Sequence, residues 1–168
     1  MLTFGSNSGG GGGQVLWSAS ASISVSTSPT FLYLAGTYLR DQTGPGSSLC
    51  LRAWGELVVN AGAGIPRLSV RMGNTYLQVS LGEQTSSGLW MAELHAARSP
   101  LASSNELRGM LRASASSDAG ESQVHAYGTD DWVDAQTNFL NLSARWDEPS
   151  SDRILRLHQV ELIHTPRP

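Results

Sequence analysis

The residues that could perform acid–base chemistry are few and scattered along this sequence. The four histidines stand singly, and none has a second ligand at the spacing that zinc motifs use: His95, His125, His158 and His164. General acid–base catalysis needs carboxylates or imidazoles held in one cleft, and no segment brings such a set together. A Gly-x-Ser-x-Gly nucleophile motif is also absent. We therefore expect no catalytic residue, and a hydrolytic β-sandwich enzyme is the least favoured interpretation.

The densest acidic segment is GTDDWVD, which contains Asp130, Asp131 and Asp134. Such a segment could hold Ca²⁺, but a dedicated calcium loop supplies more oxygen ligands at regular spacing. The favoured interpretation is a solvated turn with Trp132 folded onto the domain. The sequence therefore predicts no metal and no cofactor.

Composition excludes several classes of function. Charged residues make up 15% of the chain, against about 25% in an average soluble domain. All eleven basic residues are Arg, so Schiff-base lysines and phosphate-loop lysines are ruled out. The net charge of −3 makes nucleic acid and anionic membranes unexpected partners. The single Cys50 excludes an internal disulfide framework, and we expect it to be a small buried hydrophobe rather than a nucleophile.

The N-terminal segment is of low complexity, with GSNSGGGGG at 5–13. Glycine loses the most backbone entropy on ordering, so residues 1–13 are predicted to form a flexible arm. No Gly-Lys-Ser/Thr follows the glycines, which argues against a phosphate-binding loop. The sequence has neither the pattern of a signal peptide nor an apolar run of about 20 residues. We expect a soluble protein made in a reducing compartment, with residues 14–168 as one domain.

Apolar and polar residues alternate along most of the remaining chain, as β-strands require. In WSASASISVS, at 17–26, the serines share one face and the apolar residues the other. Similar alternation marks segments 49–54, 90–97, 106–115 and 140–146, with turn-rich intervals between them. Eight to ten short strands of this kind predict an antiparallel β-sandwich or barrel. The last run, 153–163, is less regular: a strand is favoured, and a bulge, a strand buried on both faces or a short helix would each fit.

The segment 67–81, RLSVRMGNTYLQVSL, predicts a hairpin with its register. A two-residue loop with glycine first suits a type II′ turn, so Gly73-Asn74 is placed there. This pairs apolar residues on one face: Met72 with Thr75, Val70 with Leu77 and Leu68 with Val79. On the other face Arg71 lies across from Tyr76, where a cation–π contact is expected.

The residues that share a strand face with each tryptophan indicate whether it belongs to the core or to the surface. Trp90 and Trp146 share strand faces with apolar residues, which predicts core positions. Trp54 is flanked on its own face by Arg52 and Glu56. It is therefore the better candidate for an interface or ligand contact.

The order of these segments resembles a jelly-roll module common among structural proteins of tailed bacteriophages. The resemblance covers most of residues 14–163 and is carried by VLWSASASISVS, SLCLRAWGEL, PRLSVRMGNTYLQV, GLWMAELHAARS, ELRGMLRASAS and NFLNLSARWDEPSSDRILRLHQVELI. It implies a jelly-roll β-sandwich at 14–168 that functions without catalysis as a virion component. The forms that it implies are a capsid decoration or cement protein, a head-fibre base, and a tail or fibre module.

Partners and location follow from the same resemblance. It implies a homotrimer that binds the major capsid protein or another virion protein, with the arm reaching a neighbour. The location would be the virion, after synthesis in the host cytoplasm. The alternative is a tail or fibre module that binds a host-surface glycan. The residues expected at interfaces are Leu2, Phe4, Trp17, Trp54, Arg71, Tyr76 and Trp132.

Overall fold

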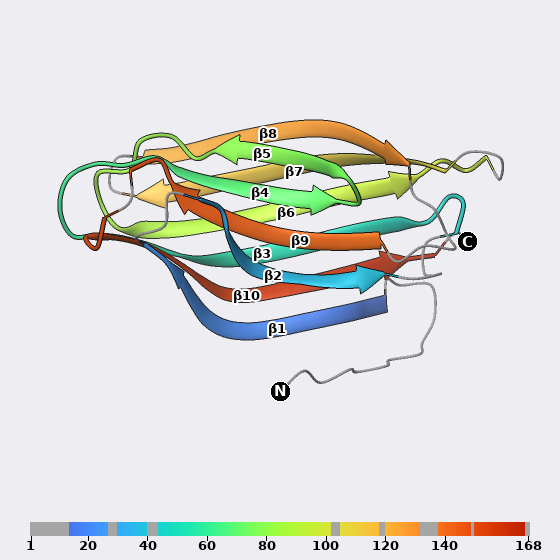
Figure 1. The fold of residues 1–168 in the computed structure, drawn as a ribbon, viewed down its shortest axis with the longest axis horizontal. Helices are drawn as coiled ribbons and strands as arrows, with labels where there is room; N and C mark the ends of the chain where they lie inside the picture. Colours follow the sequence, from blue (N-terminus) through green and yellow to red (C-terminus); the bar gives the residue numbers. More distant parts are fainter. Residues whose placement is uncertain are drawn as a thin grey trace.

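The part of the chain that the structure describes folds into ten β-strands (Figure 1). The computed structural model describes residues 14–26, 30–39, 44–101, 105–117, 120–131, 138–148 and 150–166. The strands are β1 Gln14–Val25, β2 Leu32–Leu39, β3 Ser48–Val59, β4 Pro66–Met72, β5 Thr75–Ser80, β6 Gly88–Arg98, β7 Glu106–Ser117, β8 Gly120–Asp131, β9 Asn138–Trp146 and β10 Arg153–Thr165. Within these ranges there is no helix, and so none that could cross a membrane. The predicted arm, 1–13, lies outside the described residues.

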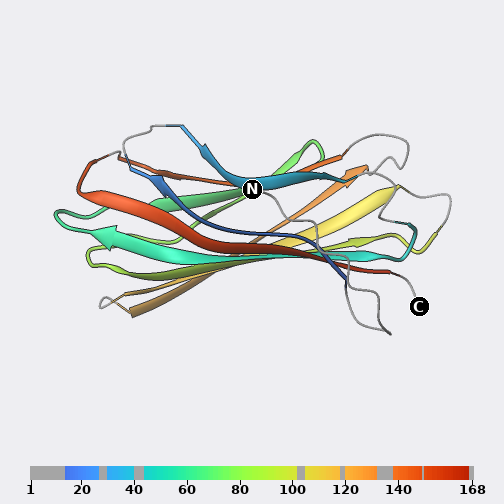
Figure 2. The same ribbon diagram turned by 90° about the horizontal axis from the view of Figure 1, so that it is seen from below.

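The strands form two antiparallel sheets that pack face to face (Figure 2). The six-stranded sheet has the order β1-β10-β3-β6-β7-β8, and the four-stranded sheet has the order β2-β9-β4-β5. The predicted all-β sandwich is therefore confirmed.

The chain crosses between the two sheets at most connections, and the β4–β5 hairpin and the run β6-β7-β8 each stay within one sheet. Without the β7–β8 hairpin, the two orders are β1-β10-β3-β6 and β2-β9-β4-β5. Position by position, each strand then matches its neighbour in the sequence: β1 with β2, β10 with β9, β3 with β4, and β6 with β5. The β7–β8 hairpin widens the first sheet beyond β6.

The predicted β4–β5 hairpin is confirmed in every expected pair. Met72 lies across from Thr75, and the remaining partners follow in the predicted register. Gly73 has a φ of 61°, a conformation that favours glycine in a two-residue turn. The Arg71 guanidinium lies 5.6 Å from the centre of the Tyr76 ring, so the expected cation–π contact is present.

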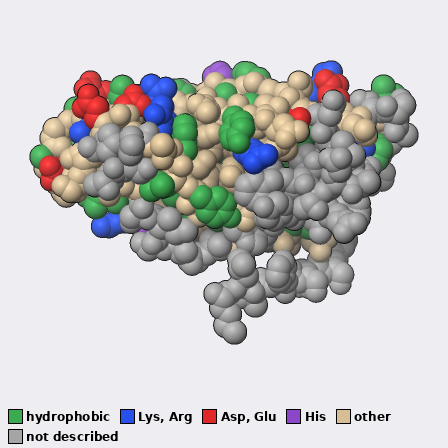
Figure 3. Space-filling view, in the orientation of Figure 1, with side chains coloured by type: hydrophobic (Ala, Val, Ile, Leu, Met, Phe, Trp, Pro, Cys, Tyr) green, Lys and Arg blue, Asp and Glu red, His purple; other side chains and the backbone are tan. Residues whose placement is uncertain are grey.

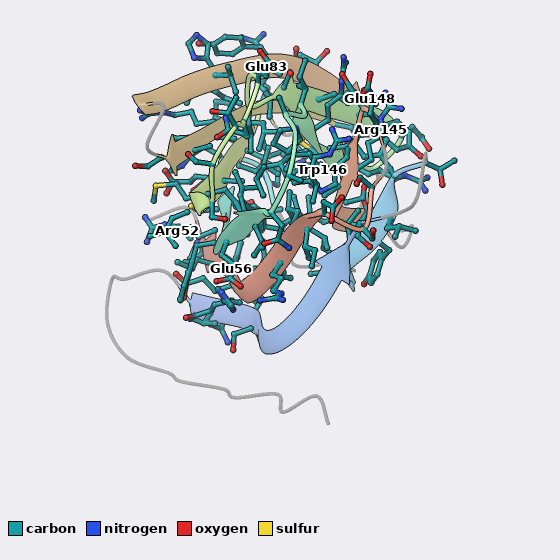
Figure 4. All side chains as sticks on the ribbon, turned by 90° about the vertical axis from the view of Figure 1, so that its left-hand side faces the viewer. Arg52, Glu56, Glu83, Arg145, Trp146 and Glu148 are labelled. Carbon is teal, nitrogen blue, oxygen red and sulfur yellow. The ribbon has the colours of Figure 1, made fainter. Side chains whose placement is uncertain are left out.

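The core fills the space between the two sheets, because alternate residues of each strand point inward. Trp90 and Trp146 are almost completely buried, as predicted, and Figure 4 shows Trp146 between the layers. The Trp146 indole donates a hydrogen bond of 3.2 Å to the Val25 carbonyl, which joins β9 of one sheet to β1 of the other. Leucines supply most of the remaining large buried side chains, including Leu34, Leu49, Leu51, Leu57, Leu68, Leu81, Leu94 and Leu107.

Strand β10 contains the irregularity that its sequence indicated. Leu157 pairs with Gly55 of β3, and Gln159 pairs with the adjacent Trp54, so one extra residue is accommodated at His158. A bulge of this kind reverses the alternation. It explains why Leu157 before the bulge and Val160 after it both point into the core.

Candidate functional site

The outer face of the six-stranded sheet carries a row of alternating charges. Its charged members lie in register across four neighbouring strands, from β10 to β7: Glu161, Arg52, Glu93 and Arg112. On β8, His125 lies across from Arg112. Within the row, Arg52 Nε donates a hydrogen bond of 2.7 Å to Glu93 Oε1. Figure 4 shows Arg52 and Glu56 on this side of the sandwich, with Arg145 and Glu148 on the opposite side.

Large hydrophobic side chains are exposed on the same face. The exposed fractions are 47% for Trp54, 60% for Met91, 61% for Leu89 and 70% for Tyr127. Trp54 and Met91 lie directly across from each other on β3 and β6. The Trp54 indole donates a hydrogen bond of 3.3 Å to Gln159 Oε1, and its ring centre lies 5.2 Å from that of His158. Trp54, the candidate for an interface or ligand contact, is therefore accessible on this face.

Two shallow hollows lie on this face and meet at Arg52. The first, of about 530 Å³, is bordered by Trp54 and Met91 together with polar side chains that include Glu93, Arg112, Gln159 and Glu161. The second, of about 690 Å³, is bordered by Cys50, His95, Arg108, Met110 and Tyr127, among others. The face therefore offers apolar surface, hydrogen-bond donors and carboxylates side by side.

Cys50 lies beside the second hollow, not in the core where the sequence placed it. It is half-buried on the outer face and donates to Glu93 Oε1 at 3.5 Å. The second carboxylate oxygen, Glu93 Oε2, lies 3.1 Å from His95 Nε2. The prediction failed because both faces of β3 carry apolar residues, so alternation alone did not identify the inward face.

Burial and charge shift the proton affinities of this group. Burial, followed by the negative charge of Glu93, raises the pKa of the Cys50 thiol to about 11. Burial pushes the pKa of Glu93 upward, but hydrogen bonds with Arg52 and His95 outweigh it and hold that pKa below its ordinary value. The carboxylate is therefore ionised at neutral pH and the thiol is protonated.

Of the predicted interface residues, the structure describes the side chains of three, and these three lie on two opposite faces. Arg71 and Tyr76 lie on the outer face of the four-stranded sheet, opposite to Trp54. Figure 3 looks onto that side, where hydrophobic side chains form separate spots among polar ones. The backbone of Trp17 pairs with Leu162, but its side chain is not described. The other three, Leu2, Phe4 and Trp132, lie outside the described residues.

The acidic segment begins within a strand rather than a turn. Asp130 belongs to β8, and its carboxylate accepts a hydrogen bond of 2.6 Å from the Asn74 backbone N–H. Thr75 Oγ1 donates to the Thr129 carbonyl at 2.8 Å. Asp130 thus anchors the β4–β5 turn to the opposite sheet. The side chain of Asp131 and all of Asp134 lie outside the described residues.

Sequence reasoning missed the importance of Met91 and Glu93. Their alternation with Trp90 and Ala92 did place them on the wetter face of a strand, together with His95. Alternation within single strands could not predict that β6 pairs with β3. That pairing sets Met91 beside Trp54 and Glu93 beside Arg52.

No protein-family model and no curated protein sequence matches this chain. Among solved structures, the legume lectin-like domain from Entamoeba histolytica is similar, with 8% sequence identity and a TM-score of 0.30. The alignment covers 86% of this chain and 87% of that domain. A similarity of this degree carries no argument about function.

Proposed function

We propose that the chain is a non-enzymatic virion protein of the tailed-bacteriophage type, a capsid decoration protein that assembles as a homotrimer. In this proposal the chains contact one another through the outer face of the six-stranded sheet. The observation that carries it is the exposure of Trp54, Leu89, Met91 and Tyr127 on that single face. Leu89 and Met91 are neighbours on the outer face of β6, and Trp54 lies across from Met91; exposed apolar surface of this kind marks interaction sites on soluble proteins.

The composition of the face supports a protein partner. Tryptophan, tyrosine, methionine and arginine are enriched in protein–protein interfaces, and Arg52, Arg108 and Arg112 accompany the exposed apolar residues. Opposite charges alternate along the row that contains Arg52 and Glu93. A second protein surface would therefore not have to compensate a large excess of one sign.

The strand order supports the jelly-roll form of the sandwich. Orders β1-β10-β3-β6 and β2-β9-β4-β5, in which successive strands lie in opposite sheets except for the β4–β5 hairpin, fit an eight-stranded double Greek key. Jelly rolls of this form occur in viral capsid and lectin domains. Of these two classes, the sequence resemblance to phage structural modules favours the viral capsid domains. The added β7–β8 hairpin supplies Arg112, Met110 and Tyr127 and so enlarges the proposed contact face.

The proposed mechanism is cementing. A trimer that touches several capsid subunits at once gains affinity from effective concentration, even where each single contact is weak. The glycine-rich segment at 5–13 would serve as a tether to a neighbouring subunit.

The virion assignment is tested by mass spectrometry of gradient-purified particles from a lysate in which this gene is expressed. We expect the chain in the particle fraction, and immunogold labelling should place it on the head. A chain found only in the particle-free supernatant would contradict the proposal.

A second candidate function is glycan binding at the first hollow. It is favoured by the half-exposed Trp54 ring beside Gln159 and Glu161, because an aromatic face stacks on a sugar while polar neighbours fix its hydroxyls. A glycan array with the native chain and with Trp54→Ala and Gln159→Ala separates the two functions. Glycan binding that both substitutions abolish, in a chain whose native mass stays unchanged, would favour this candidate.

A further inference from the structure

Three side chains from two paired strands meet at the boundary between the two hollows. Cys50 belongs to β3, and Glu93 and His95 belong to β6; one potential ligand atom from each lies within 4.8 Å of the others. The strands hold them in place, because Cys50 is the direct cross-strand partner of His95. All three side chains are at least partly accessible to solvent.

We propose that Cys50, Glu93 and His95 bind a Zn²⁺ ion, with the fourth coordination position open to the second hollow. Thiolate sulfur, imidazole nitrogen and carboxylate oxygen are the three ligand types that Zn²⁺ takes in proteins. Three protein ligands and one open position form the common arrangement of an accessible zinc site. This inference does not rest on the proposed assembly function, although the site lies on the same outer face of the six-stranded sheet.

The separations between the ligand atoms suit a tetrahedral ion. With ordinary zinc–ligand bond lengths, a sulfur and an oxygen ligand lie about 3.5 Å apart, and a nitrogen and an oxygen ligand about 3.3 Å apart. Cys50 Sγ lies 3.5 Å from Glu93 Oε1, and His95 Nε2 lies 3.1 Å from the other oxygen, Glu93 Oε2. One ligand atom from each of the three residues lies within 4.8 Å of the others, and a rotation of the Glu93 carboxylate would direct a single oxygen at an ion held by Cys50 and His95.

Two of the proposed ligands can carry a negative charge. A Cys50 thiolate and the Glu93 carboxylate together balance the two charges of the ion. Arg52 donates to Glu93 Oε1 and leaves Oε2 directed at His95. Hydrogen bonds of this type to a ligating carboxylate orient the ligand, so Arg52 is a positioning residue in the proposed site.

Binding would require the Cys50 thiol to lose its proton. Because the pKa of that thiol is about 11, the metal-free chain holds the proton at neutral pH. A coordinated zinc ion deprotonates a thiol outright, and the proton leaves to solvent. Zinc binding is therefore expected to release a proton and to weaken as the pH falls.

The test is a calorimetric titration of Zn²⁺ into the purified full chain, with Cys50→Ser, His95→Gln and, as a matched control, His125→Gln. His125 is exposed on the same face but is not part of the cluster. We expect one ion per chain, a loss of affinity of at least about tenfold in the two ligand variants, and no change in the control. No zinc binding by the native chain, or equal binding by Cys50→Ser, would overturn the proposal.

A second readout identifies the sulfur ligand directly. Substitution with Co²⁺ should give the near-ultraviolet charge-transfer absorption of a thiolate–cobalt bond in the native chain. Cys50→Ser is nearly isosteric, so it should fold normally while losing that absorption. A cobalt complex without this band would also overturn the proposal.

Discussion

Trp90 of β6 donates its indole N–H to the Arg156 carbonyl of β10, at 2.9 Å, across the intervening strand β3. The bond is possible because β3 has Gly55 at the crossing point, next to the bulge in β10. A Cβ atom at this position would overlap the Arg156 carbonyl oxygen and lie 2.8 Å from Trp90 Nε1. The glycine in SLCLRAWGEL therefore leaves room for a hydrogen bond that links β6 to β10 across β3, beneath the proposed contact face.

Gly55→Ala is expected to destabilise the fold by about 3 kcal/mol, since it overpacks the core and breaks the bond between Trp90 and Arg156. Urea unfolding followed by tryptophan fluorescence measures the change. Gly44→Ala is the matched control, because a Cβ atom there meets no other atom within 4 Å. A Gly55→Ala protein as stable as the control would show that the strands are arranged differently here.

Asp130→Ala is expected to cost about 1 kcal/mol of stability, because the Asn74 N–H loses its charged acceptor. Asp152 is exposed in the turn before β10, so Asp152→Ala should change the stability much less. Equal effects in the two variants would argue against anchoring of the hairpin by Asp130. A melting temperature of the native chain that rises with added Ca²⁺ would instead favour a calcium site in the acidic segment.

Asp147→Asn should lower stability more at pH 7 than at pH 3. Arg67 donates to Asp147 Oδ1 at 2.5 Å and to Oδ2 at 2.9 Å, and these hydrogen bonds hold the pKa of the carboxyl below its ordinary value. A lowered folded-state pKa adds stability that is present above the unfolded value of about 3.9 and disappears as the pH falls through the folded value. Both side chains are partly exposed, so we expect no more than about 1 kcal/mol.

Urea unfolding of the native and Asp147→Asn chains at the two pH values measures this difference. Glu148→Gln serves as control, since that side chain is largely exposed and lies 3.9 Å from Arg153. A cost of Asp147→Asn that is the same at pH 3 and pH 7 would contradict the account of this ion pair.

Alkylation of Cys50 by iodoacetamide should be slow at neutral pH and rise with a midpoint near pH 11, because only the thiolate reacts. Glu93→Gln removes a negative charge and a hydrogen-bonding acceptor, so it should lower the pKa of the thiol and speed the reaction. Arg52→Gln should raise that pKa and slow the reaction. The rates are measured by mass spectrometry in the presence of a chelator. Identical pH profiles in all three chains would show that Glu93 and Arg52 do not affect the pKa of the Cys50 thiol.

The sequence predicted contacts between residues close together along the chain, and it did not predict contacts between residues far apart along the chain. The β4–β5 hairpin was predicted pair by pair, since a two-residue turn fixes the register of its own strands. The Cys50–Glu93 contact joins residues 43 apart, and it depends on which strands are neighbours in the sheet. For 153–163 the irregular alternation indicated a bulge as one of several possibilities, because a reversal of faces alone does not distinguish a bulge from a strand buried on both faces or a short helix.

The measurement that tests the central claim most directly is sedimentation equilibrium of the native full chain and of Met91→Arg. If the outer face of the six-stranded sheet joins the subunits, the native chain has the mass of a trimer. A charged side chain in place of Met91 then yields the mass of a single chain. Gln78→Arg, exposed on the opposite face, should leave the trimer intact. A native chain with the mass of a monomer, or a Met91→Arg chain that remains trimeric, would contradict the claim.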